Sequence, residues 1–198
     1  MTYSIVGSGN IGTAVARQFA LNGIDVEIAN TRGSESLEHL RKDLGLHIVP
    51  QTLESALRAD IVILAVPFPA AAAIARAHGN WVGKIVIDAT NAIDFPAYTP
   101  TDLGGRPSSA VIAELLRGAR VVKAFNTLPA AVLAADPQQG GGRRVLFISG
   151  DDAQANSEIA NLIEKLGFAS IVLGKLAEGG LLQQYGGPLV IHNMVKLG

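Results

Sequence analysis

The feature that most constrains this chain is a series of short apolar segments that alternate with segments of helical periodicity. The apolar segments are rich in Val and Ile, and most of them are continuously apolar. Such runs are typical of strands covered on both faces. A repeated order of strand, helix and strand predicts a mostly parallel sheet with helices on both sides, that is, a doubly wound α/β fold.

The expected elements follow from these patterns along the chain. Two segments rich in Pro or Gly, at 94–107 and 137–144, interrupt the order and are expected to be surface loops. We expect strands at 3–6, 26–29, 47–49, 61–66, 84–87, 120–124, 145–148 and 170–173, and helices at 11–21, 34–44, 53–58, 70–77, 109–116 and 153–166.

Composition limits the class of protein. With 198 residues the chain fits one domain, and because it has no cysteine it offers neither disulfides nor a thiolate nucleophile. A net charge of −1 argues against nucleic-acid binding and against a polybasic membrane anchor. No apolar run reaches the ~18 residues of a membrane span, no signal peptide is visible, and the histidines lack metal-ligand spacing. We therefore expect a cytoplasmic protein without a metal site.

The first expected strand is followed by the pattern G-x-G-x-x-G, formed by Gly7, Ser8, Gly9, Asn10, Ile11 and Gly12. Because it also opens an expected helix, this pattern is typical of a dinucleotide-binding turn. Gly7 would permit the tight turn, Gly9 would let a pyrophosphate approach the backbone, and Gly12 would let the helix pack closely against the strand. Unpaired amides at the helix start would hold the phosphates. The alternative is a purely structural turn.

The end of the second expected strand indicates which dinucleotide would bind. NAD-selective sites usually have a carboxylate there, but this chain continues with Asn30, Thr31, Arg32, Gly33 and Ser34. A guanidinium with neighbouring hydroxyls suits a 2′-phosphate, which favours NADP. Alternatively, Arg32 is a solvated turn residue and Ser34 only the N-cap of the next helix.

The ends of the next strands are expected to line the same groove, because ligands of open parallel sheets lie outside the carboxyl ends of the strands. Val66 ends one expected strand and Pro67 follows it, and Asn91 follows the next strand. Asn91 and Asn126 could donate to a carboxamide or to a substrate, or could close their own turns. Asp88 is expected to be structural.

Residues 7–12, 30–34, 66–68, 123–129 and 150–152 together resemble the NADP-dependent coenzyme F420 reductase family. The resemblance covers essentially the whole chain and extends, more distantly, to the reductase domain of metalloreductases and to pyrroline-5-carboxylate reductases. It implies an NADP-binding Rossmann domain, which we place at 1–174, and a homodimer. We expect the C-terminal extension, 175–198, to pack at the substrate cleft or at the dimer interface.

The resemblance also implies site residues. Ser8, Asn10 and Ile11 would contact the pyrophosphate; Thr31, Arg32 and Ser34 would contact the 2′-phosphate; Val66, Pro67, Asn91 and Ala124 would lie near the nicotinamide or its ribose. Many family members have a second basic residue where this chain has Gly33.

The expected reaction follows from a search for a proton donor. Hydride transfer to a flavin-like ring depends mainly on placing two flat rings together, whereas reduction of a ketone or imine also needs an acid. Only Lys123 is a candidate acid. We expect an NADP(H)-dependent oxidoreductase with a flat small-molecule acceptor, such as a deazaflavin or flavin. The acceptor would bind over the nicotinamide, between Pro67-Phe68, Asn126 and a flap at 179–189. A reductase of a small imine or carbonyl and a non-catalytic NADP-sensing module are the alternatives.

Overall fold

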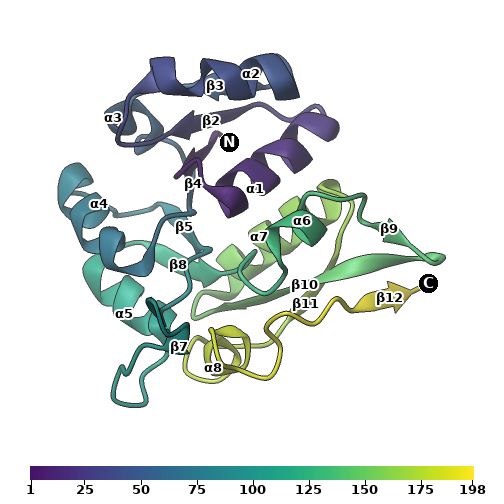
Figure 1. The fold of residues 1–198 in the computed structure, drawn as a ribbon. Coiled ribbons are helices and arrows are strands. Elements are labelled where there is room, and N and C mark those ends of the chain that lie inside the picture. The colour runs from purple at the N-terminus through teal and green to yellow at the C-terminus, as the bar shows by residue number, and fades with distance from the viewer.

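The computed structural model describes residues 1–198 and has a central sheet with helices on both sides (Figure 1). The strand order is β3-β2-β1-β4-β5-β8-β10-β11; all pairs from β3 to β8 are parallel, β10 is antiparallel to β8, and β11 is parallel to β10. The predicted doubly wound, mostly parallel fold is confirmed. These strands are β1 Tyr3–Val6, β2 Val26–Ala29, β3 Ile48–Pro50, β4 Ile61–Leu64, β5 Ile85–Asp88, β8 Arg120–Lys123, β10 Gly142–Gly150 and β11 Ala169–Val172.

The two faces of the sheet have separate hydrophobic cores. On one face, side chains such as Ile5, Ile63 and Val122 pack with α1 Asn10–Leu21, α2 Glu38–Leu44, α6 Ala130–Leu133 and α7 Ala153–Lys165. On the other face, side chains such as Val62 and Val86 pack with α3 Leu53–Ala56, α4 Ala71–His78 and α5 Ser108–Leu115. Both faces are apolar, which explains why the strand sequences do not alternate.

The chain order creates a switch point in this sheet. From β1 the chain proceeds outward to β2 and β3, and then returns to β4 on the other side of β1. The loops that follow β1 and β4 therefore diverge, which leaves a crevice outside the carboxyl ends of these two neighbouring strands. None of the helices has both the length and the hydrophobicity needed to cross a membrane.

Some local expectations were wrong. The expected helix at 34–44 begins with a 3₁₀ turn, η1 Ser34–Leu37, and a second 3₁₀ turn, η2 Phe68–Ala70, precedes α4. The Pro-rich loop contains a small hairpin, β6 Ile93–Asp94 and β7 Thr99–Pro100. The Gly-rich loop contains β9 Gln138–Gln139, which pairs with β10.

The last residues of the chain return to the sheet. α8 Gly179–Gln183 lies beside α5 and β10, and β12 Val195–Leu197 pairs antiparallel with the start of β10. The β9–β10 hairpin and β12 form an arm that extends from the body, with the C-terminus at its end (Figure 1). The segment expected as a flap, 179–189, thus contains a helix with buried residues.

Candidate functional site

The first turn has the geometry that its three glycines predict. A Cβ atom on Gly12 would overlap the carbonyl oxygen of Gly7, and one on Gly7, whose φ is 111°, would overlap the carbonyl oxygen of Ala65. These two positions therefore require glycine for packing. Gly9 is different because no atom lies within 4 Å of its Cβ position. The backbone at Gly9 is thus open on the side where α1 begins.

A hydrogen-bond network joins the first turn to the turn after β2. The Asn30 Nδ2 atom donates to the Ser8 and Ser36 hydroxyl oxygens, at 3.0 Å each, and Asn30 Oδ1 accepts from the Arg32 backbone N–H at 2.8 Å. The Ser36 hydroxyl donates to the Gly33 carbonyl at 2.7 Å. The sequence did not point to Ser36, although serine hydroxyls often hydrogen-bond to nearby backbone groups in turns.

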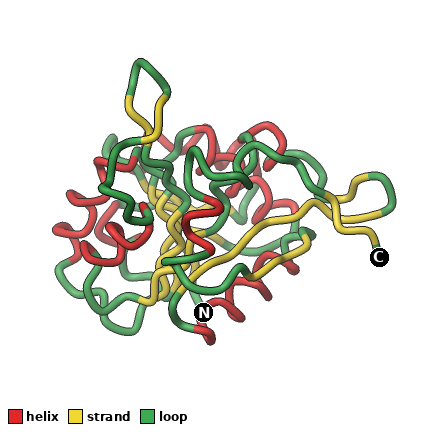
Figure 2. Tube along the Cα trace, turned by 90° about the horizontal axis from the view of Figure 1, so that it is seen from below, coloured by secondary structure: helices red, strands yellow, loops and turns green.

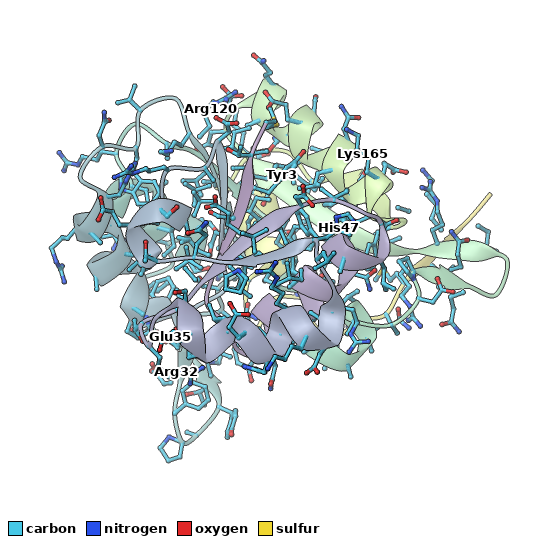
Figure 3. All side chains as sticks on the ribbon, turned by 90° about the horizontal axis from the view of Figure 1, so that it is seen from above. Tyr3, Arg32, Glu35, His47, Arg120 and Lys165 are labelled. Atoms are coloured by element: carbon cyan, nitrogen blue, oxygen red, sulfur yellow. The ribbon has the colours of Figure 1, made fainter.

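The same turn corrects the expected role of Ser34. Gly33, at φ 90°, precedes η1, and no side-chain hydrogen bond caps that 3₁₀ turn. Because its backbone is in the region that favours glycine, Gly33 fits this turn better than a second basic residue would. Arg32 is exposed, lies at the periphery of the molecule (Figure 3), and makes one side-chain hydrogen bond, from Nη2 to the Ser8 hydroxyl at 3.4 Å.

Two adjoining cavities follow the carboxyl edge of the sheet. Cavity A, of about 380 Å³, lies over β1, β2 and β4, and cavity B, of about 470 Å³, lies over α1, β4 and β5. They share Gly9, Ala65, Val66 and Pro67. Both volumes are in the range of small-molecule pockets. Cavity A is lined by Val6, Gly7, Ser8, Gly9, Asn30, Thr31, Arg32, Leu53, Ala65, Val66, Pro67, Ala70 and Ile74.

Cavity B is lined mainly by apolar groups, and none of its 13 lining residues is charged. Its residues are Gly9, Asn10, Ile11, Ala65, Val66, Pro67, Phe68, Pro69, Ala89, Thr90, Asn91, Ile93 and Phe95. The structure thus brings most of the sequence-predicted site residues to one groove, including all those of the first turn except the buried Gly12.

Besides Gly12, three predicted residues lie outside both cavities: Ser34, Ala124 and Asn126. Asn126 is buried, and its Nδ2 atom donates to the Asn91 side-chain oxygen at 3.0 Å and to the Gln183 backbone oxygen at 2.6 Å. Asn91 Nδ2 donates in return to the Asn126 backbone oxygen at 3.1 Å. Asn126 therefore positions Asn91, which lines cavity B. Cofactor contacts of Ser34, Ala124 and Asn126 stay predictions.

A buried ion pair lies beneath cavity B. The Lys123 ammonium and the Asp88 carboxylate are both fully buried; Lys123 Nζ lies 3.1 Å from Asp88 Oδ2 and donates to the Thr90 carbonyl at 3.2 Å. Ser109 and Thr90 also donate to Asp88. Burial alone would raise the pKa of Asp88, but Lys123 and these hydrogen bonds together hold that pKa below its usual value.

This arrangement gives Asp88 the structural role that its position predicts, and it directs the Lys123 ammonium into the protein. The Lys123 side chain lines neither cavity, and two of its three N–H groups have partners. Because the ion pair joins the ends of β5 and β8 and holds the Thr90 carbonyl, it fixes the floor of cavity B.

The C-terminal segment supports the site from behind. Gln183 is buried, and its Nε2 atom donates to the Lys123 backbone oxygen at 3.0 Å and to the Ser149 hydroxyl at 2.6 Å. Tyr185 lines a separate pocket of about 220 Å³ on the other side of the β6–β7 hairpin. The hypothesis that 179–189 forms a wall of the acceptor site is therefore wrong for cavity B, where Ile93 and Phe95 lie instead.

The fold, the glycine turn and the groove at the switch point define a Rossmann-type nucleotide-binding protein. Residues 2–92 match the family model described as "NADP oxidoreductase coenzyme F420-dependent". The structure of a hypothetical protein, SMa0349, from Sinorhizobium meliloti is 52% identical in sequence, with a TM-score of 0.96, over 99% of this chain and 96% of that chain. The chain belongs to one family with that protein, and the family model that residues 2–92 match describes NADP-dependent oxidoreductases.

Other similar proteins agree with this class. A candidate F420-dependent NADP-reductase from Arthrobacter sp. FB24 is 26% identical, with a TM-score of 0.73, over 89% of this chain and 86% of that chain. Metalloreductase STEAP3 of Rattus norvegicus is 27% identical over 177 residues, which are 87% of this chain and 34% of that protein. The chain thus spans about a third of the length of the curated relatives it matches. The resemblance stated from the residues is confirmed, and an enzyme is favoured over a non-catalytic module.

Proposed function

We propose that NADPH binds along the groove formed by cavities A and B and that the enzyme transfers hydride between the nicotinamide and a flat, flavin-like acceptor. When bound, NADPH supplies a hydride, a proton from solvent completes reduction of the acceptor, and NADP⁺ is the product. In this proposal residues 1–174 form the NADP domain and 175–198 support it. The homodimer implied by the family resemblance stays a prediction.

The first turn fits a pyrophosphate. The Gly9 Cβ position is open, and the backbone amides at the start of α1 need acceptors because the first N–H groups of a helix have no partner within it. The positive end of the helix dipole is at the same place. The backbone of Gly9, Asn10 and Ile11 would therefore hold the phosphates, with the Ser8 hydroxyl beside them.

The second turn fits a 2′-phosphate. No carboxylate lies at the end of β2, and Arg32 and Thr31 line cavity A with exposed side chains. A guanidinium can bind a phosphate through two parallel hydrogen bonds. With the 2′-phosphate at this end of the groove, the nicotinamide would extend into cavity B, past Val66 and Pro67, which line both cavities.

The single observation that supports a flat acceptor is the lining of cavity B. It is apolar and uncharged, and Lys123, the one candidate acid that the sequence suggested, is turned away from it into a buried ion pair. Reduction of a small carbonyl or imine would need a proton donor or an electrostatic partner at the reacting atom. Hydride transfer to a flavin-like ring depends more on alignment of the two rings.

An acceptor screen tests this proposal. Purified protein with saturating NADPH would be mixed separately with riboflavin, FMN, coenzyme F420, pyrroline-5-carboxylate and a simple cyclic ketone, and NADPH oxidation would be followed at its absorbance maximum. We expect turnover with at least one of the three ring acceptors and little with the imine or ketone. Turnover confined to the imine or ketone would contradict the proposal.

A further inference from the structure

The β6–β7 hairpin presents two large aromatic side chains to solvent. Phe95 and Tyr98 are 67% and 65% exposed, and their rings meet edge to face at 5.1 Å. The hairpin projects from the body of the molecule (Figure 2). Exposed aromatic groups that border a cavity mark a candidate binding surface, because they leave apolar area in water when the cavity is empty.

The alternation of side chains in β6 divides this hairpin into two faces. Ile93 and Phe95, two residues apart, line cavity B. Asp94, between them, points the other way and accepts a hydrogen bond from the Thr101 hydroxyl at 2.7 Å. Ala92 and Pro100 line the separate pocket on that other side. The hairpin is therefore a wall of cavity B, with its apolar face inward.

Contacts with the body hold this wall in place from outside. The Thr101 backbone N–H donates to the Ala92 carbonyl at 3.1 Å, and the Tyr185 hydroxyl, from the residues after α8, donates to the Tyr98 carbonyl at 3.0 Å. None of these contacts involves the ring of Phe95. The hairpin is thus anchored at Ala92 and Tyr98, while the ring of Phe95 stays accessible.

We propose that Phe95 and Phe68 bind the ring of the acceptor in cavity B, and that this site recognises a planar aromatic ring and not an anionic tail. The proposal rests on the proposed function and adds to it the acceptor-binding residues and the basis of specificity. Phe68 and Phe95 are the two aromatic residues that line the cavity, one from η2 and one from the hairpin. Flat rings bind aromatic side chains by offset or edge-to-face stacking.

The lack of charged residues in cavity B supports the second part of the proposal, that the site does not recognise an anionic tail. A phosphate or carboxylate on an acceptor is normally bound by Arg, Lys or a helix start. The helix start that faces the groove is that of α1, which the pyrophosphate of NADPH would use, and no Arg or Lys lines cavity B. An acceptor tail would therefore extend into solvent, and acceptors with the same ring would be used about equally.

Steady-state kinetics on the full chain test both parts. With NADPH saturating, Phe95→Ala should raise KM for riboflavin about fivefold to tenfold, the scale of one aromatic stacking contact in a binding constant. The Kd for NADPH should stay within twofold. Phe95→Tyr, which keeps a flat ring, should stay close to the parent. Tyr98→Ala is the comparison variant. Tyr98 is equally exposed on the same hairpin and meets the Phe95 ring edge to face, but it lines neither cavity A nor cavity B, so its effect on KM should be smaller than that of Phe95→Ala.

The outcomes separate this proposal from the function on which it rests. If riboflavin and FMN are turned over but Phe95→Ala leaves KM unchanged, or Tyr98→Ala has the same effect, the acceptor binds elsewhere and only this inference fails. A preference of more than tenfold for FMN over riboflavin would overturn ring-only recognition. If none of the flavin or deazaflavin acceptors is turned over while NADPH still binds, the proposed function itself fails.

Discussion

Two cations near the carboxyl edge of the same sheet have opposite surroundings. Arg32, after β2, is exposed, has no carboxylate partner and contacts one neutral hydroxyl at 3.4 Å. Lys123, at the end of β8, is fully buried and paired with Asp88 at 3.1 Å. A buried pair has its charge already neutralised, whereas an exposed guanidinium beside a cavity keeps its hydrogen-bonding capacity for a ligand. The comparison predicts that Lys123 acts on stability and Arg32 on cofactor choice.

The largest effect should come from Lys123→Met. This variant leaves the Asp88 carboxylate buried without its counter-charge, which costs about 3–5 kcal/mol in the free energy of unfolding. Urea unfolding would measure it. The double variant Asp88→Asn, Lys123→Met should be destabilised by less than the sum of the two single variants, because it removes both charges. Simple additivity would contradict the coupling between the two side chains.

The pH dependence of stability tests the Asp88–Lys123 pair in a second way. Because the pKa of Asp88 is lowered in the folded protein, its stabilising effect is present above the unfolded-state pKa of about 3.9 and is lost as the pH falls through the folded-state pKa. The stability advantage of the parent over the double variant should therefore shrink below about pH 4. Urea unfolding at a series of pH values measures this difference in the free energy of unfolding. If the difference between the parent and the double variant stays constant down to acid pH, Asp88 is not ionised in the folded protein.

Gly9→Val should have the next largest effect, on binding and not on folding. The Cβ position is open, so the fold tolerates a side chain there, but that side chain would occupy the space proposed for the pyrophosphate. We expect the Kd values of both NADPH and NADH to rise at least about a hundredfold by calorimetry, with the melting temperature within a few degrees of the parent. The Kd values of Gly9→Ala should lie between those of the parent and those of Gly9→Val. Parent-like affinity in Gly9→Val would mean that the turn is only structural.

Arg32→Ala should change cofactor preference. Loss of a charge-assisted hydrogen bond should weaken NADPH binding by about 1.5–3 kcal/mol and leave NADH within twofold. Arg17→Ala is the matched control, because it removes the same charge from an exposed position on α1 that lines neither cavity. Equal losses for NADPH and NADH would contradict the 2′-phosphate assignment.

The parts of the molecule that could be predicted from the sequence depend on local patterns. β1 and β2 have the expected bounds, 3–6 and 26–29, because each is a short, mostly apolar segment that ends at turn residues. The glycine turn was predictable because two of its glycines are required by packing against neighbouring backbone. Local sequence also predicted eight of the 13 residues that line cavity A, since these eight lie in turns that come directly after strands.

The parts that could not be predicted depend on residues far apart in the chain. Asn126 is held by Gln183, 57 residues later, and Lys123 pairs with Asp88, 35 residues earlier. Neither pairing leaves a periodic signal, because each is created by the strand order. The β6–β7 hairpin was missed because its strands are two residues each and lie in a Pro-rich segment, where composition favours a loop.

The smallest effect should come from Ser36→Ala, which tests whether the turn around Arg32 must be held in place. The Ser36 hydroxyl joins Asn30 to the Gly33 carbonyl, and Asn30 in turn accepts from the Arg32 backbone N–H. Loss of one such hydrogen bond is worth about 0.5–1.5 kcal/mol, so the NADPH Kd should rise about twofold to tenfold. NADH should be affected less, because it has no 2′-phosphate to be positioned against Arg32. Ser36→Thr keeps the hydroxyl and should restore binding by calorimetry. Two results would contradict this role: an NADPH Kd for Ser36→Thr as high as that for Ser36→Ala, or an equal rise in the Kd values of NADPH and NADH. In either case Ser36 acts through packing, and other contacts of the turn set the position of Arg32.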